Sequence, residues 1–223
     1  MQEAIGSNTH RGYIFLSGLV LLAACDLAEE GCGASLNGAP DGDGETCTTG
    51  HPCSGVDDGP IEPDLPLVAL RRAIGSVASA FFDAAIPSVS AASAPDRPGA
   101  RVRDGYGLGG VRAESLAGLP SVFEVGLPAY LAARDMSPER DVAAFYALAV
   151  LMQRVEDTTA VARCGIEGLA RLRRDGAALQ MILERGADPR PALSLWNDEY
   201  CAQRLTMGGV ADCLALVLAL AEA

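Results

Sequence analysis

Apolar residues recur at every third or fourth position through most of the chain after residue 110, and this spacing constrains the fold more than any other feature. One such run consists of Phe145, Leu148, Met152 and Val155. This spacing places one apolar stripe along an α-helix, whereas a half-buried strand alternates apolar and polar residues. No segment shows clear alternation, and the sequence has no internal repeat. The sequence therefore predicts an all-α fold.

The composition agrees with closely packed helices. Hydrophobic residues make up 49% of the chain and aromatic residues only 5%, so the apolar set is mainly Ala, Leu and Val. These residues suit packed helices better than a β-sandwich. A chain of 223 residues can bury one substantial core. We predict a single helical domain over residues 1–223.

Two segments interrupt the helical pattern. Residues 26–65 are rich in Gly, Asp, Pro, Thr and Cys and have almost no periodic apolar pattern, so we expect a disordered loop or an insertion. Residues 87–104 are expected to be a linker that leads into a glycine-rich turn ending at Gly110. Helices are predicted over residues 6–25 and 66–85, after Ser137-Pro138, up to Gly176, up to Gly186, from Pro191 and from Gly208-Gly209.

The apolar run from Tyr13 to Cys25 allows two interpretations. It ends in a Leu-Ala-Ala-Cys sequence that is typical of a lipoprotein signal, with Cys25 as the lipid-attachment site. However, Glu3 precedes it and the basic excess of a signal peptide is missing. The run is also too short to span a membrane comfortably. We favour a buried core helix without membrane contact, with an exported lipoprotein as the alternative.

The net charge argues against nucleic-acid binding. The chain has 17 basic and 29 acidic residues, a formal charge of −12, whereas binding to nucleic acid needs clustered positive charge. A phosphate-bearing small ligand stays compatible, because a few arginines and helix N-termini suffice to bind it. Cys164, Cys201 and Cys213 are expected to be small buried apolar residues in a reducing compartment, which indicates the cytoplasm.

Four polar clusters interrupt the apolar helices. The first, Asn8-Thr9-His10-Arg11-Gly12, precedes the first predicted helix and is also explained by simple capping. The second, residues 106–114, is a glycine-rich loop in which Arg112 is a candidate phosphate ligand; an ordinary turn is the alternative.

The third and fourth clusters are residues 156–159, with Arg163 following, and residues 206–212. Neighbouring helical residues diverge by about 100°, so Glu156 and Asp157 cannot point the same way, and we expect at least one of them to lie near the core face. We expect the buried carboxylate to need Arg163, Arg112 or a magnesium ion as its partner. In the fourth cluster, two glycines at a helix start offer N–H groups to an anion, and Asp212 either belongs to the site or only complements the helix dipole.

Taken in order, the four clusters resemble the conserved blocks of the triphosphoribosyl-dephospho-coenzyme A synthase family. The block SNTHRGYIFLSGLVLLAAC (7–25) resembles "NTHKGAIF…GLL", and GYGLGGVRAESLAGLPSV (105–122) resembles "G-x-R-G-E-A…G-F-P". Likewise, LMQRVEDTTAVARCG (151–165) is similar to "LM…EDTN…RGG", and TMGGVADCLAL (206–216) to "SPGGSADLLA". Four blocks in the family's order are more specific than any one of them.

The resemblance implies transfer of the 5-triphosphoribosyl group of ATP to the 2′-hydroxyl of 3′-dephospho-CoA, with release of adenine. The product is the prosthetic-group precursor of citrate lyase or malonate decarboxylase carrier proteins. ATP and dephospho-CoA would be the partners and Mg²⁺ the cofactor. On this basis Glu156 and Asp157 are expected to bind magnesium or act as base, with His10 as an acid. The expected substrate-binding residues are Asn8, Thr9, Arg11, Arg112, Glu114, Arg163, Gly208, Gly209 and Asp212, with Glu114 orienting Arg112.

The sequence also departs from the family pattern. Nothing in it matches the further N-terminal region, with a "PKPG" type stretch, that family members usually carry. Ala113, Thr159 and Val210 replace the family's glycine, asparagine and serine. A catalytically incomplete remnant, or a subunit that depends on a complementing N-terminal polypeptide or on a homo-oligomer, is therefore an alternative to an enzyme that acts alone.

Overall fold

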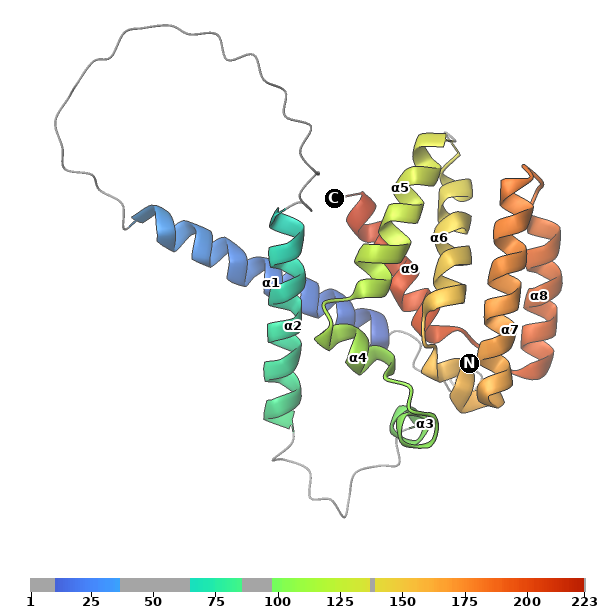
Figure 1. Ribbon diagram of the computed structural model, residues 1–223, viewed down its shortest axis with the longest axis horizontal. Helices are drawn as coiled ribbons and strands as arrows, with labels where there is room; N and C mark the ends of the chain where they lie inside the picture. The colour runs from blue at the N-terminus through green and yellow to red at the C-terminus, as the bar shows by residue number, and fades with distance from the viewer. Residues whose placement is uncertain (1–10, 37–64, 86–97, 137–138, 223) are drawn as a thin grey trace, which may run out of the picture.

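The computed structural model describes residues 11–36, 65–85, 98–136 and 139–222. Within these ranges every regular element is helical, which confirms the predicted all-α fold (Figure 1). The elements are α1 (Arg11–Leu36), α2 (Leu65–Ala85), α3 (Pro98–Tyr106), α4 (Gly110–Leu116), the π-helical segment η1 (Ser121–Gly126), α5 (Leu127–Met136), α6 (Arg140–Arg154), α7 (Thr158–Glu184), α8 (Arg190–Gln203) and α9 (Gly208–Ala221).

Helices α5 to α9 form a bundle, and α1 and α2 pack together beside it (Figure 1). Helix α6 packs against α5, α7 and α9, while α1 packs against α2 and α9. In Figure 1, α1 and α2 cross on one side of the bundle, and α7 and α8 lie together on the other. One main core joins these parts and contains buried residues of α1, α2, α6 and α9. The short helix α4 contacts both α1 and α2.

The apolar N-terminal run is helical as predicted, but only one of its faces lies in the core, because Ile14, Leu21 and Leu22 are each more than half exposed. Leu16, Leu19 and Ala23 of α1 are each exposed by 3% or less, and they belong to the main core. However, α1 continues to Leu36, although we expected residues 26–65 to be irregular. Residues 26–30 include good helix formers that extend a helix once it has begun. Residues 6–10 lie outside the described residues.

The predicted linker at 87–104 is partly wrong. Residues 98–106 form α3, and Val102 of this helix is buried against Val161 and Leu169 of α7. A helix as short as this one is marginal alone, so its packing against α7 explains why the local sequence did not reveal it. The rest of the predicted linker lies outside the described residues.

The predicted helix end at Gly176 is also wrong. Helix α7 continues to Glu184 and ends before Gly186, which has φ +66°. Gly176 is buried, and a β-carbon there would lie 2.7 Å from the Cβ of Met152 on α6. The glycine therefore allows α6 and α7 to approach closely. The predicted starts of α8 and α9 are confirmed to within two residues, whereas Ser137 and Pro138 lie outside the described residues.

Two further observations concern the burial of the cysteines and the length of the apolar helices. Cys213 is buried as expected, but Cys164 is half-buried and Cys201 is exposed, so the expectation of three buried cysteines was wrong for the latter two. Among the described helices, none alone is both long and apolar enough to cross a membrane. The bent pair of α4 with residues 121–136 meets that criterion only by length and composition.

Candidate functional site

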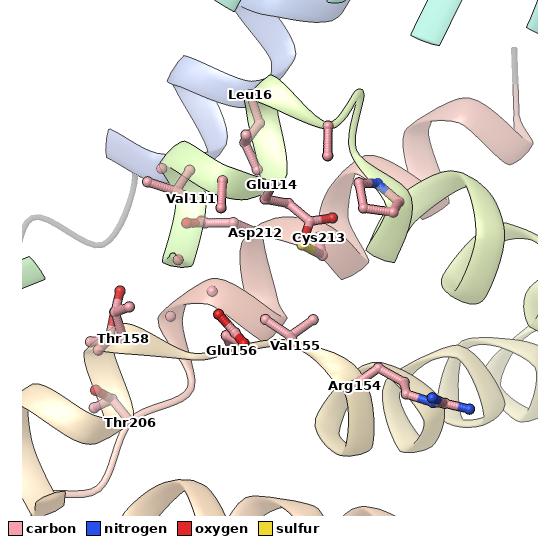
Figure 2. Close-up of a pocket in the computed structure, with 18 of the residues that line it drawn as sticks. Leu16, Val111, Glu114, Arg154, Val155, Glu156, Thr158, Thr206, Asp212 and Cys213 are labelled. Carbon is pink, nitrogen blue, oxygen red and sulfur yellow. The ribbon is translucent and has the colours of Figure 1, made fainter. Parts of the chain in front are cut away.

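A cavity of about 540 Å³ lies where α1, α4, the junction of α6 with α7, and the start of α9 meet (Figure 2). It contains residues of all four polar clusters, although these clusters are far apart in the sequence. The cluster residues that line it are Gly12, Gly110, Val111, Ala113, Glu114, Glu156, Thr158, Thr159, Arg163, Thr206, Gly208, Gly209 and Asp212.

Three carboxylates line this cavity: Glu114, Glu156 and Asp212. In Figure 2, Glu156 points from the loop between α6 and α7 towards the side of the cavity that carries Glu114 and Asp212. Glu156 is exposed, and its Oε2 accepts a hydrogen bond of 2.9 Å from the backbone N–H of Gly109. The glycine-rich loop is therefore fixed to the third cluster by a carboxylate that also faces the cavity.

Glu114 is held in place by Ser121 at the start of η1. Its Oε1 accepts from the Ser121 backbone N–H at 2.6 Å, and its Oε2 accepts from the Ser121 hydroxyl at 3.0 Å. Burial raises the pKa of Glu114, the two Ser121 hydrogen bonds oppose that rise, and the charges of Glu156 and Glu124 add to it. Glu114 was expected to orient Arg112, but the structure shows that it binds Ser121.

Asp157 is fully buried and does not line the cavity. It is the N-cap of α7: its Oδ1 accepts from the backbone N–H groups of Thr159 and Ala160, each at 2.9 Å. Its Oδ2 accepts from the N–H of Val210 at 3.0 Å. We expected an arginine or a magnesium ion as the partner of this carboxylate. That expectation was wrong, because the two helix N-termini supply the donors.

The glycines of these clusters lie where backbones approach side chains closely. A β-carbon at Gly12 would lie 1.8 Å from Oδ2 of Asp212, which places the start of α1 directly against α9. A β-carbon at Gly208 would lie 3.0 Å from Oγ1 of Thr159. These glycines therefore let α1, α7 and α9 converge on the cavity.

The arginines divide into two groups. Arg163, which was predicted to bind substrate, lines the cavity, and so does Arg154 at the end of α6, whose side chain extends away from the cavity's centre in Figure 2. Arg112 does not line the cavity: its Cζ lies 4.6 Å from the ring centroid of Phe82 on α2. Sequence reasoning missed Arg154, although its position two residues before Glu156 was an available signal.

Part of the predicted site cannot be placed. Asn8, Thr9 and His10 lie outside the described residues, and Arg11 begins α1 but its side chain is not described. Because Gly12 lines the cavity, the described part of the chain begins beside the site. The roles expected of these four residues stay predictions.

The described residues do not form a metal site of their own. They contain no group of three or more His, Cys, Asp or Glu side chains arranged to hold a metal ion. Mg²⁺ usually keeps several waters and binds through one or two carboxylates together with substrate phosphates. The exposed Glu156 and the cavity-lining Asp212 fit this second mode, whereas the hydrogen bonds of Asp157 to backbone N–H groups do not.

Comparisons with known proteins agree on one family. The model of the family described as ATP:dephospho-CoA triphosphoribosyl transferase matches residues 1–223. A probable 2-(5''-triphosphoribosyl)-3'-dephosphocoenzyme-A synthase of Stutzerimonas stutzeri is 31% identical over 222 residues, which cover 98% of this chain and 61% of that protein. The protein of the same name from Pectobacterium carotovorum is 31% identical over 211 residues, 95% of this chain and 58% of that protein.

A third relative with this name, from Azotobacter vinelandii, is 36% identical over 126 residues, 56% of this chain and 43% of that protein. The chain thus spans about three fifths of the length of the first and second of these relatives. No solved structure is significantly similar to it.

Proposed function

The chain belongs to the ATP:dephospho-CoA triphosphoribosyl transferase family, and on that basis we propose that it transfers the 5-triphosphoribosyl group of ATP to the 2′-hydroxyl of 3′-dephospho-CoA. In this reaction the bond between C1′ and the adenine nitrogen breaks, and a bond from C1′ to the acceptor oxygen forms. The acceptor's proton is lost and adenine gains one.

The observation that supports this proposal most strongly is the convergence of all four polar clusters on one cavity. The cavity volume, about 540 Å³, falls in the range that is usual for small-molecule sites. Three carboxylates and two arginines line the same space. A glycosyl transfer needs a group that accepts the hydroxyl proton and negative charge near the cationic sugar carbon; the three carboxylates supply both kinds of group.

We assign the phosphate contacts to Arg163 and to the start of α9 at Gly208 and Gly209. A helix N-terminus carries partial positive charge and favours phosphate, and a guanidinium binds phosphate oxygens in a fork. Mg²⁺ bound with ATP would neutralise part of the triphosphate charge, with Glu156 and Asp212 as its protein contacts. His10 and Arg11, which precede Gly12, are proposed to contact substrate from the first cluster.

The wider context is also a proposal. The product would be the prosthetic-group precursor of citrate lyase or malonate decarboxylase carrier proteins, made in the cytoplasm, where ATP is available. A second copy of the chain, or a polypeptide that complements it, is proposed as a partner if the chain is inactive alone.

The test is adenine release by the full chain, incubated with ATP, dephospho-CoA and Mg²⁺ and followed by chromatography. The proposal expects release only when all three are present, and a matched Glu156→Gln variant should be at least tenfold slower. Coenzyme A already carries a 3′-phosphate and serves as the acceptor control. Adenine release at the same rate without any acceptor would indicate a nucleosidase and contradict the proposal.

A further inference from the structure

We propose that Asp157 is a positioning residue: its buried carboxylate holds the N-terminus of α9 against the N-terminus of α7 and so sets the shape of the cavity, without contacting substrate or metal. The inference rests on the proposed function only for its kinetic readout. It differs from the role in metal binding or base catalysis that the sequence suggested for this residue.

The geometry is that of a clamp between two helices. The side chain has no exposed surface. Oδ1 accepts from two N–H groups in the first turn of α7, and Oδ2 accepts from the N–H of Val210 in the first turn of α9. The N–H of Gly209 is a further backbone donor to the same carboxylate. Each oxygen therefore serves a different helix.

Burial raises the pKa of the Asp157 carboxyl, and the surrounding backbone N–H groups oppose that rise because they stabilise the ionised form. In this ionised form the carboxylate attracts both helix ends. Each helix N-terminus carries about half a positive charge, so two of them close together repel one another. A negative group between them converts that repulsion into attraction to a common centre. Asn has nearly the same shape, but it carries no charge and can place an acceptor on only one side. The amide N–H₂ would then face the N–H groups of the second helix.

The residues on either side of the clamp line the cavity, although Asp157 does not. Glu156 and Thr158 flank it in the chain, and a β-carbon at Gly209 would lie 3.3 Å from its Oδ2. Asp212 also lines the cavity, from the first turns of α9. Movement of the α9 N-terminus away from α7 would therefore shift these cavity-lining groups together.

The experiment compares two substitutions that retain the cap of α7 but lose the link to α9. Serine is a good N-cap, so in Asp157→Ser the hydroxyl oxygen can still accept a hydrogen bond from the first turn of α7. The serine side chain is too short to reach the N–H of Val210. Asp157→Asn keeps the length without the charge. The matched control is Asp175→Asn, another buried aspartate on α7, which binds Arg171 and Tyr200 and lies outside the cavity.

The measurements are Tm, the KM for ATP, kcat, and the Mg²⁺ concentration that gives half-maximal rate. Both Asp157 variants should raise the KM for ATP about tenfold, equivalent to about 1.4 kcal/mol, and lower kcat by less than tenfold. The Mg²⁺ requirement should stay unchanged. Asp175→Asn should lower Tm while KM and kcat stay within twofold of the wild type.

Other outcomes would overturn the inference. A fall in kcat of a thousandfold or more, or a shift in the Mg²⁺ requirement, would show that Asp157 acts as a base or metal ligand. A rise in the KM for ATP that Asp175→Asn reproduces at an equal Tm would show a general effect of stability.

A kinetic result is obtained only if the wild type releases adenine, and its failure to do so would count against the proposed function alone. The positioning role is then decided by amide hydrogen exchange at Val210. Exchange at this N–H should become at least tenfold faster in Asp157→Ser and stay unchanged in Asp175→Asn. Equal exchange rates in the wild type and in Asp157→Ser would refute the clamp.

Discussion

Thr158 lies directly over Gly110, so closely that a β-carbon at Gly110 would come within 2.6 Å of Cγ2 of Thr158. Gly110 also has φ +53°, in the left-handed region. This contact joins the start of α4 to the start of α7 at the edge of the cavity. The second and third sequence clusters therefore depend on one another for their placement.

The first prediction concerns this contact. Gly110→Ala should lower the free energy of unfolding by about 1–3 kcal/mol, because it adds steric overlap to a strained backbone conformation. Adding Thr158→Ala removes Cγ2 and should restore part of the loss, although the backbone cost stays. Urea denaturation of the two single variants and the double variant measures this coupling. If the two single substitutions change the free energy of unfolding by amounts that simply add up in the double variant, the two residues do not contact one another in solution.

The second prediction is a pH dependence at Glu114. Its pKa is raised, chiefly by burial, so the folded protein holds more protons than the unfolded chain between the ordinary glutamate value, about 4.3, and the raised value. The contribution of Glu114 to the free energy of unfolding therefore falls as pH rises through this interval.

Glu114→Gln removes that titration. The free energy of unfolding of the wild type minus that of the variant should decrease as pH rises above about 4.3 and become constant once the wild-type carboxyl is ionised. The loss of one hydrogen bond to Ser121 adds a constant offset of about 1 kcal/mol. Urea titrations between pH 4 and pH 8 measure the difference. A difference that grows with pH would mean that the pKa is lowered instead.

The third prediction concerns the break within α7. Gly165 has φ 66° and ψ −168°, a combination that is essentially restricted to glycine. No atom lies within 4 Å of a β-carbon placed there, so Gly165→Ala should cost about 1–3 kcal/mol through backbone strain alone.

The matched control is Gly18→Ala. Gly18 lies inside α1, and its β-carbon would also meet no atom within 4 Å. This substitution should stabilise the protein by up to about 1 kcal/mol, because alanine has the higher helix propensity. Tm values of the two variants should thus move in opposite directions. Equal shifts would show that the α7 backbone does not have the described break.

The fourth prediction separates two arginines. Arg163→Ala should raise the Kd for ATP about tenfold with little change in Tm, because Arg163 is exposed and lines the cavity. Arg112→Ala should leave the Kd unchanged and lower stability by about 0.5–1 kcal/mol, because Arg112 lies over Phe82. Calorimetric titration with ATP and thermal unfolding measure both. Weaker ATP binding on loss of Arg112 would return this residue to the site.

Local signals in the sequence predicted the helices with a clear apolar stripe and glycine or proline at their ends. Helices α2, α8 and α9 belong to this group. Local sequence signals did not predict α3, because this helix depends on burial of Val102 against α7. They also failed at Gly176, because a glycine that ends a helix and one that admits a neighbouring helix look the same in a sequence.

The sequence by itself determined the fold class, the family resemblance and the four clusters, because periodicity and short motifs are properties of neighbouring residues. Only the tertiary structure decided which cluster residues share a cavity. It placed Glu114 and Arg163 in the cavity and Arg112 outside it. It also showed that Asp157 is satisfied by N–H groups of two helices, one of which begins some fifty residues away. Partners so distant along the chain are selected by packing, which no local pattern records.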